Sequence, residues 1–321
     1  MRVLVTGGAG FIGSHLVEAL VGAGHTVFVV DNLSRGAAAH LPPGISFFVM
    51  DIRDPAVEDL LREVRPAVIH HLAAQVDVAA AVANPLHDAE VNLLGTIRLL
   101  QAAVRAGVDR VVVASSAAVY GEPERLPVPE DHPLRPQSPY GLSKAAMEGY
   151  VQWFGRHHRL SWVILRYGNV YGPRQPAVGE AGVVAQFMAA LRAGRPPMIH
   201  GDGEQTRDFV FVTDVAAAHL WVMDGGMEGI YNIGTGQAVS VRALWERLRS
   251  LWGATIEPCH GPPRPGDIRH MVLDPRRAAG LGWRARVSLV EGLARLVAEA
   301  RNSEGRADRW EADGGGPSAS S

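Results

Sequence analysis

Tyr140 and Lys144 lie four residues apart, and their side chains could together carry out proton transfer. On a helix this spacing places both residues on one face. An unperturbed tyrosine has a pKa of about 10, so it is a poor proton acceptor near neutral pH. An ammonium group about 5 Å away favours the phenolate by on the order of 3 kcal/mol at an effective dielectric constant near 20. The pair therefore predicts a tyrosine whose pKa is low enough to accept a proton.

The residues just before this pair predict where the helix begins. Ser138 is a preferred N-cap residue and Pro139 a preferred residue of the first helical turn. Tyr140 is then near the positive end of the helix dipole, which also favours the phenolate. The spacing alone is common, and a surface tyrosine and lysine that share a helix by chance are the alternative.

A glycine-rich turn follows the first apolar segment of the chain. Gly8, Gly10 and Gly13 satisfy the pattern G-x-G-x-x-G, and Gly7 extends it. Such glycines permit a tight turn, close approach of a pyrophosphate and close packing of helix on strand. The phosphates then lie at free N–H groups of the helix N-terminus. Because the turn lies between an expected strand and an expected helix, it predicts a dinucleotide site.

The residue at the end of the next expected strand indicates which dinucleotide binds. Asp31 follows Gly13 by 18 residues, where a carboxylate accepts hydrogen bonds from ribose hydroxyls and repels a 2′-phosphate. This favours NAD over NADP. Arg35 is close enough in sequence to reach a 2′-phosphate and keeps NADP as the alternative.

Composition excludes several classes of protein. The chain has 321 residues, with 31 basic and 33 acidic side chains, and this balance argues against a nucleic-acid partner. Cys259 is the one cysteine, so no internal disulfide forms and a reducing cytoplasm is expected. No apolar run approaches the roughly 20 residues that span a membrane. The adjacent histidine pairs at 70–71 and 157–158 lack the spacing of a zinc helix, so no metal is expected.

Apolar runs alternate with amphipathic segments through the first half of the chain, which predicts a doubly wound α/β domain with a parallel sheet. The expected strands are Arg2–Thr6, Thr26–Asp31, Ser46–Asp51, Ala67–Leu72, Arg110–Ser115 and Trp162–Tyr167. The expected helices between them lie near residues 12–23, 55–64, 89–106 and 140–158.

The pattern loosens after Gly168, which predicts a smaller, discontinuous C-terminal domain for the substrate. Helices are expected near 182–193, 240–252 and 287–301, a strand at 230–233, and loops at 172–182 and 257–266. The expected division of the chain is a Rossmann domain at 1–168 with return segments near 205–236, a substrate domain at 169–204 and 237–301, and a disordered tail at 302–321.

The ordered set of motifs resembles the extended short-chain dehydrogenase/reductases, from residue 1 to about 300. The set is the glycine turn, Asp31, the serine pair at 115–116 and the tyrosine–lysine pair. Segments at 166–174, 201–208 and 264–267 resemble the nucleotide-sugar members, most of all the UDP-glucose 4-epimerases. The resemblance implies NAD as cofactor and a UDP-sugar as substrate, and it implies a homodimer formed through helices near 89–106 and 140–158.

The resemblance also implies roles by position. Tyr140 takes the proton of the sugar 4-hydroxyl, Lys144 lowers the tyrosine pKa and binds the nicotinamide ribose, and Ser116 binds the 4-oxygen. The expected cofactor contacts are Gly7, Gly10, Phe11, Ile12, Gly13, Asp31, Asn32, Ser34, Arg35, Gly36, Asp51, Ile52, Leu72, Ala73, Ala74, Gln75, Asn92, Ser115, Tyr140, Lys144 and Tyr167. The expected substrate contacts are Ser116, Tyr140, Asn169, Val183, Arg207, Arg264 and Asp267.

Two alanines after the serine pair discriminate among related reactions. Sugar-nucleotide dehydratases carry an acidic residue in this segment and UDP-glucuronate decarboxylases usually carry a glutamate, but here Ala117 and Ala118 occupy the variable positions. The resemblance therefore implies epimerisation at C4, by oxidation to a 4-keto sugar, rotation and reduction. UDP-glucose and UDP-galactose are the expected substrates, and the N-acetylated and uronic-acid sugars are the alternatives. A non-catalytic NAD-sensing protein is a further alternative, against which the intact Ser116, Tyr140 and Lys144 argue.

Overall fold

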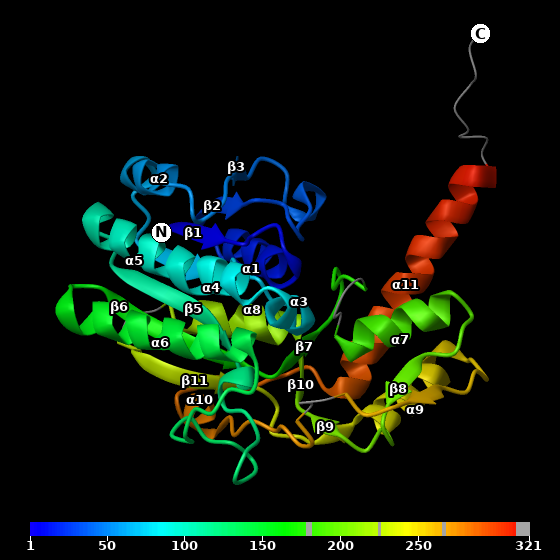
Figure 1. Cartoon of the computed structure of the whole chain (residues 1–321). Coiled ribbons are helices and arrows are strands. Elements are labelled where there is room, and N and C mark those ends of the chain that lie inside the picture. The colour runs from blue at the N-terminus through cyan, green and yellow to red at the C-terminus, as the bar shows by residue number, and fades with distance from the viewer. Residues whose placement is uncertain (178–181, 224–225, 265–267, 313–321) are drawn as a thin grey trace.

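A parallel seven-stranded sheet forms the larger of two lobes in the computed structural model, which describes residues 1–177, 182–223, 226–264 and 268–312 (Figure 1). The strand order is β11-β6-β5-β4-β1-β2-β3, so the order reverses between β1 and β4. Ligands of such sheets bind at this switch point, outside the carboxyl ends of the strands. The strands are β1 Arg2–Thr6, β2 Thr26–Asp31, β3 Ser46–Val49, β4 Val68–His71, β5 Arg110–Ser116, β6 Ser161–Tyr167 and β11 Gly229–Ile233.

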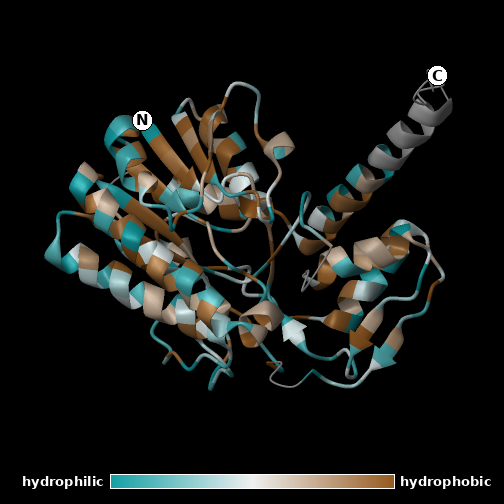
Figure 2. Ribbon diagram, turned by 45° about the horizontal axis from the view of Figure 1, so that its top comes forward, coloured by the Kyte–Doolittle hydropathy of each residue, from teal (hydrophilic) through white to brown (hydrophobic). Residues whose placement is uncertain are grey.

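Helices cover both faces of this sheet because successive strand residues point to opposite faces and both sets are apolar. Leu4 belongs to the core shared with α2 (Ala56–Val64), α5 (Gly95–Ala106) and α6 (Pro139–His157). Its neighbours in β1 belong to the opposite core, with α1 (Phe11–Gly22) and α8 (Val212–Trp221). Figure 2 shows the strands as mostly hydrophobic and much of the hydrophilic colour on helix surfaces and loops. The expected doubly wound α/β fold is confirmed.

The helix expected at 89–106 is interrupted. It consists of α4 (Pro85–Ala89), a π-helical segment at Glu90–Leu94 and α5. A shorter helix, α3 (Val78–Ala83), precedes it, and 3₁₀ turns occur at Ala38–His40 and Ala117–Val119. π-Bulges of this kind are frequent at functional sites.

The smaller lobe has its own core, between α7, α9 and α11 (Figure 1). The rings of Phe187 and Trp245 pack edge to face in this core, with centroids 5.2 Å apart. The strands of this lobe and of its junction with the large sheet form two-stranded pairs: β7 with β10, β9 with β12 and β8 with β13. Its elements are α7 Val183–Arg192, α9 Val241–Trp252, α11 Leu289–Ala312, β7 Asn169–Tyr171, β8 Met198–His200, β9 Thr206–Arg207, β10 Phe209–Phe211, β12 Val239–Ser240 and β13 Cys259–Gly261.

The structure differs from the sequence expectations at several points of the second half. The segment expected as a loop at 257–266 contains β13. Trp283 and α10 (Arg276–Gly280) pack with the large sheet, although they belong to the stretch assigned to the substrate domain. Helix α11 continues to Ala312, so residues 302–312 are helical where disorder was expected, and the rest of the expected tail lies outside the described residues.

Helix α8 was not expected from the sequence. It is apolar on nearly every side and packs against α1, so it shows no amphipathic pattern. It accounts for much of the expected return segment near 205–236, together with β11. Across the described parts of the chain, no helix combines the length and the apolar character that crossing a membrane requires.

Candidate active site

The expected cofactor residues converge on the carboxyl edge of the large sheet. The glycine turn follows β1, Asp31 ends β2, and the segment from Leu72 follows β4. Ser116 ends β5 and pairs in register with Tyr167, which ends β6. Because parallel strands place their carboxyl ends at one edge, residues far apart in sequence share one site.

The glycine turn leaves no space for side chains. Gly7 has φ near +70°, and a Cβ there would lie 2.7 Å from the backbone nitrogen of Ala73. A Cβ on Gly13 would lie 2.0 Å from the carbonyl oxygen of Gly7. Gly10 is the N-cap of α1 and supplies no side-chain hydrogen bond, so the N–H groups near Phe11 and Ile12 stay available for a phosphate. The turn therefore fits a dinucleotide.

Asp31 joins the end of β2 to this turn. Its carboxylate accepts the N–H of Ala9 at 3.0 Å and the N–H of Leu33 at 2.8 Å, and the residue is 7% exposed. Each carboxylate oxygen accepts more than one hydrogen bond, so acceptor capacity is left for a ribose. Arg35 forms an ion pair with Asp77 at 3.6 Å. The guanidinium group of Arg35, which keeps NADP as the alternative, therefore pairs with a carboxylate of the protein in this structure.

A second carboxylate, Asp51, is held in place after β3. Arg53 donates two side-chain hydrogen bonds of 2.9 Å to it, and Asn32 donates a third of 2.9 Å. These donors, the Arg53 side chain above all, hold the pKa of Asp51 well below its usual range. Ser34 donates its N–H to the Asn32 side chain. Hydrogen bonds among these side chains thus fix the loops at the ends of β2 and β3.

Asn92 connects the segment after β4 to α6. Its side-chain oxygen accepts the N–H of Gln75 at 2.8 Å, and its amide donates to the Gln75 carbonyl at 2.9 Å. The same amide donates to Asp88 at 3.0 Å and to Ser143 at 3.2 Å. Asn92 is 1% exposed, and the π-helical segment directs it inward. The amide therefore positions the loop from 72 to 75, where cofactor contacts are expected.

The Ser116 hydroxyl lies beside the phenol of Tyr140, close enough to act on its pKa. Tyr140 lies in the first turn of α6, which begins as expected: the Ser138 side chain accepts the N–H of Gly141 at 3.1 Å. Ser116 also accepts the N–H of Ala118 at 3.2 Å. The phenol and the serine are the two groups expected at the sugar 4-oxygen, and the fold brings them together.

Lys144 lies one turn further along α6 and is 4% exposed. Its Nζ donates to the carbonyl of Ala114 in β5 at 3.0 Å. Burial lowers its pKa to about 8, while the charges of Asp88 and Glu148 act in the opposite direction. It is the only lysine among the 321 residues. The ammonium group is thus buried beneath the site and anchored to the sheet.

The expected direction of the tyrosine pKa is wrong for this structure. Burial raises the pKa of Tyr140 above its usual value, the neighbouring Ser116 hydroxyl opposes this rise, and the charge of Asp88 adds to it. The expectation counted a nearby ammonium group but not the cost of burying a phenolate, which raises the pKa. Lys144 also directs its Nζ to the Ala114 carbonyl.

The two adjacent serines differ in what they contact. Ser115 is 3% exposed and donates to Glu148 at 2.5 Å, whereas Ser116 contacts Tyr140. Consecutive strand residues point to opposite faces, which explains the difference. The side chain of Ser115, expected at the cofactor, is instead hydrogen-bonded within the core. Glu148 also forms a buried ion pair with Arg166 at 2.6 Å.

Tyr167 is connected to a pair of buried histidines. Its hydroxyl is hydrogen-bonded to Nε2 of His219, and the Nδ1 atoms of His219 and His70 lie 2.8 Å apart. Burial lowers the pKa of His219 to about 3 and that of His70 well below its usual value, so both rings are neutral. Because both rings are neutral, one Nδ1 atom donates a hydrogen bond and the other accepts it. This hydrogen bond orients His219, which in turn holds the hydroxyl of Tyr167 at the end of β6.

The expected substrate residues belong to the smaller lobe and its junction with the sheet. Asn169 begins β7, Val183 begins α7, and Arg207 lies in β9, where its guanidinium donates to the Thr206 carbonyl at 2.8 Å. Arg264 lines a cavity of about 310 Å³, together with His200, Gly201, Asp202, Gln205 and Arg269. Asp267 lies outside the described residues.

Sequence reasoning missed four buried polar residues that support the site. Asp88 and Glu148 lie near Lys144, and His219 contacts Tyr167. Asp208 is fully buried and accepts the N–H groups of Thr235 and Gly236, although burial raises its pKa. Asp88 precedes Asn92 by one helical turn, and that spacing was the available signal. His219 gave no signal because its helix was not expected.

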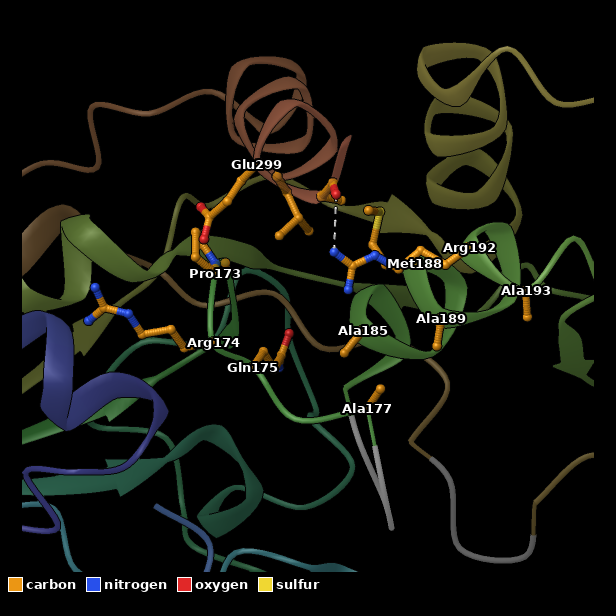
Figure 3. Close-up of a pocket in the computed structure, with 13 residues that line it drawn as sticks. Pro173, Arg174, Gln175, Ala177, Ala185, Met188, Ala189, Arg192, Ala193 and Glu299 are labelled. Carbon is orange, nitrogen blue, oxygen red and sulfur yellow. Dashed lines mark hydrogen bonds between the residues drawn. The ribbon is translucent and has the colours of Figure 1, made fainter. Parts of the chain in front are cut away.

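A larger cavity, of about 570 Å³, lies between α7, α11 and the loop from Gly172, and its lining includes none of Ser116, Tyr140 and Lys144 (Figure 3). Arg174 reaches from this loop to Ser14, at 3.1 Å, and to Glu18. Arg192 donates to the carbonyl of Ala300 at 3.4 Å across the cavity. Both arginines of this cavity therefore form hydrogen bonds that join different elements of the protein.

The family profile of "NAD dependent epimerase/dehydratase family" matches residues 3–234. A UDP-glucose 4-epimerase of Mycolicibacterium smegmatis is 46% identical over 312 residues, covering 94% of this chain and 99% of that protein. The crystal structure of a Thermotoga maritima UDP-glucose 4-epimerase with UDP-glucose has a TM-score of 0.93 and 42% identity, covering 95% and 100% of the two chains. A Thermus thermophilus UDP-glucose 4-epimerase in complex with NAD has a TM-score of 0.91 and 46% identity, covering 94% and 100%. The chain belongs to the NAD dependent epimerase/dehydratase family.

Proposed function

We propose that this enzyme interconverts UDP-glucose and UDP-galactose by NAD-dependent epimerisation at C4. The observation that carries the proposal is the placement of the Ser116 hydroxyl beside the Tyr140 phenol, with Lys144 buried one turn along the same helix. The similarity to UDP-glucose 4-epimerases over nearly the whole chain supports it.

In this mechanism the protein moves one proton at the sugar 4-oxygen. Bound NAD supplies the site that accepts a hydride and returns it. Tyr140 takes the hydroxyl proton, and Ser116 donates a hydrogen bond to the same oxygen. Lys144, whose ammonium group is anchored to the Ala114 carbonyl, is assigned by resemblance to the nicotinamide ribose. The same groups return the proton after the keto sugar has rotated, so the reaction is reversible.

The cofactor is held by the sheet edge and the substrate by the smaller lobe. The glycine turn receives the pyrophosphate and Asp31 the adenosine ribose. Asn169, Arg207 and Arg264 bind the diphosphate, since guanidinium groups pair well with phosphate oxygens. Asp267, outside the described residues, is assigned to the uridine ribose by resemblance.

The residues behind Ser116 favour epimerisation over elimination. Ala117 is 7% exposed and packs in a cluster with Val119, Met271 and Leu273. Neither Ala117 nor Ala118 supplies the extra acid or base that removal of water requires. By resemblance, a position near Met271 limits the bulk at C2 of the sugar; Met271 is 4% exposed, and its flexible side chain sets no sharp size limit there.

A panel of nucleotide sugars tests the reaction and the sugar together. The purified enzyme is incubated with UDP-glucose, UDP-N-acetylglucosamine or UDP-glucuronate, and the products are separated by chromatography. UDP-galactose from UDP-glucose at the highest kcat/KM is the expected result. A 4-keto-6-deoxy sugar or released carbon dioxide contradicts epimerisation, and a preference for another sugar contradicts the substrate. Tyr140→Phe is the control variant. It is expected to lower kcat by about 10²–10⁴-fold and to retain bound NAD.

We also propose a homodimer formed through α6 and the helices beside it. Large apolar side chains on these helices are exposed: Leu86 at 68%, Leu142 at 61%, Trp153 at 47% and Tyr150 at 44%. Large exposed apolar side chains concentrated on neighbouring helices are typical of protein–protein interfaces. Light scattering after size exclusion is expected to give twice the chain mass of 34.4 kDa, and Leu142→Glu with Trp153→Glu to give the monomer. A monomeric wild type contradicts the proposal.

We place the enzyme in the cytoplasm. The free Cys259 is exposed, and a lone exposed thiol suits a reducing compartment. Fractionation of the source cells tests this assignment, and recovery of the enzyme outside the cytoplasmic fraction contradicts it.

A further inference from the structure

The carboxylate of Asp88, in α4, is buried with one oxygen unused. The residue is 1% exposed, and its Oδ1 accepts hydrogen bonds from Gln75 at 3.1 Å and from Asn92 at 3.0 Å. Within the described part of the chain, Oδ2 is buried and has no hydrogen-bond partner. Burying a carboxylate oxygen without a donor is costly unless a positive charge lies nearby. The arrangement therefore indicates a compensating cation.

Lys144 is the cation that fits. Helix α4 packs against α6, and the Asn92 amide that binds Asp88 also reaches Ser143, the residue before Lys144. The negative charge of Asp88 opposes the effect of burial on the pKa of Lys144 and adds to the rise in the pKa of Tyr140. Asp88 thus acts on both members of the catalytic pair.

Other ionisable groups around this pair have partners of their own. Glu148, from α6, also raises the pKa of Lys144 but is bound to Arg166 and Ser115. His71, from β4, is hydrogen-bonded to two threonines, and burial together with Lys144 lowers its pKa to about 3, so it carries no charge.

Two more carboxylates on the neighbouring elements are also ion-paired. Asp77, before α3, pairs with Arg35, and Glu90, in the π-helical segment, pairs with Arg53 at 3.6 Å. Neither is among the charges that shift the pKa of Lys144. The carboxylate of Asp88 is therefore available to act on the ammonium group.

We propose that Asp88 is a positioning residue for the 4-epimerase reaction, whose buried carboxylate keeps Lys144 charged and joins the cofactor loop at Gln75 to the catalytic helix. The inference depends on the proposed roles of Tyr140 and Lys144. Asp88 touches neither the sugar nor the nicotinamide in this scheme. It sets the pH range over which the lysine keeps its proton.

Because Lys144 is the only lysine, its titration can be observed directly. The NAD-loaded protein is grown with lysine carrying carbon-13 at Cε, and the one Cε resonance is followed against pH by NMR. Asp88→Asn keeps the size and the Oδ1 acceptor but removes the charge. Lys144 is then expected to lose its proton about one pH unit lower than in the wild type. An unchanged Lys144 titration in folded Asp88→Asn overturns the proposal.

Three further variants control for loss of folding and for a general charge effect. Asp88→Glu keeps the charge and is expected to titrate near the wild type; Asp88→Ser removes it and is expected to shift like Asp88→Asn. Asp59→Asn removes an exposed carboxylate from α2, where the side chain is 81% exposed, and is expected to leave the titration unchanged. An equal shift in Asp59→Asn contradicts the proposal.

The pH dependence of kcat/KM is a second test, because loss of a purely structural residue would leave the limbs of the profile at the same pH. In Asp88→Asn both limbs of the profile are expected to move to lower pH, because the charge raises the pKa of Tyr140 as well as that of Lys144. A lower maximum with unmoved limbs contradicts the positioning role. The NMR titration needs no substrate, so a failure of the proposed epimerisation is seen separately, in the sugar panel.

Discussion

The phenol of Tyr140 lies beside the hydroxyl of Ser116, which ends β5, the neighbour of the central strand β4. The two residues are 24 positions apart in the sequence, and the proposed mechanism assigns both to the 4-oxygen of the sugar. The neighbouring hydroxyl, that of Ser115, is directed to Glu148 on the other side of the strand.

The two serines are therefore expected to respond differently to substitution. Ser116→Ala removes the proposed donor to the sugar 4-oxygen and is expected to lower kcat by about 10²-fold, with a loss of about 1 kcal/mol of stability because the N–H of Ala118 loses its acceptor. Ser115→Ala removes a hydrogen bond to a buried carboxylate and is expected to cost about 1.5–3 kcal/mol of stability. Steady-state kinetics and urea unfolding of both variants provide the comparison. Equal effects on kcat contradict the division of roles.

Asp31 is expected to decide between the two dinucleotides. Asp31→Asn keeps the shape but places an amide donor near the N–H groups of Ala9 or Leu33, both of which the carboxylate accepts. The NAD dissociation constant, measured by titration calorimetry, is expected to rise about tenfold or more, since hydrogen bonds to charged groups contribute about 1.5–3 kcal/mol. The preference for NAD over NADP should fall as the repelling charge is lost. Unchanged selectivity would show that Asp31 acts only on the loop.

The fold was predictable largely because each strand of the large sheet is a short apolar run. The expected strands and the order of the glycine turn, Asp31 and the catalytic helix agree with the structure. Helix α6 begins at Pro139, as the N-cap Ser138 indicates. Local capping and turn chemistry thus predicted where the tyrosine lies.

Features that depend on contacts between distant segments could not be predicted in this way. Helix α8 is buried on most sides, so its sequence lacks an amphipathic period. The direction of the Tyr140 pKa depends on burial, which spacing along one helix does not reveal. Asp88 was missed because its effect on Lys144 depends on how α4 packs against α6.

Lys144 gives the protein a pH-dependent stability of defined sign. Burial lowers its pKa from 10.5 to about 8, so the unfolded chain holds this proton more tightly than the folded protein between these values. The free energy of unfolding therefore rises with pH across that window, as Lys144 loses its proton in the folded protein. Below the window the destabilisation caused by burying the charged lysine is fully present. The shift corresponds to about 3 kcal/mol. Urea unfolding of wild type and Lys144→Met across this range tests the trend, and a difference independent of pH contradicts it.

The buried ion pair of Glu148 with Arg166 is expected to matter more for stability than the surface pairs. Both side chains are at most 2% exposed, and two hydrogen bonds, of 2.6 and 2.9 Å, join them. Glu148→Gln leaves the guanidinium group buried without an anion and is expected to destabilise the fold by about 3–5 kcal/mol. Glu58→Gln is the matched control on the surface of α2, where Glu58 pairs with two partly exposed arginines.

The control is expected to cost at most about 1 kcal/mol, because exposed ion pairs are screened by solvent. Urea unfolding of the two variants measures the difference. A Glu148→Gln protein as stable as Glu58→Gln contradicts the assignment, and would mean that Arg166 retains enough compensation from the Tyr120 hydroxyl and the Glu130 carbonyl, to which it donates at 2.9 and 3.1 Å. Since Glu148 also acts on Lys144, the same variant is expected to lower the pKa of that lysine. Loss of stability and a shifted lysine titration in one variant would connect the core of the fold to its catalytic helix.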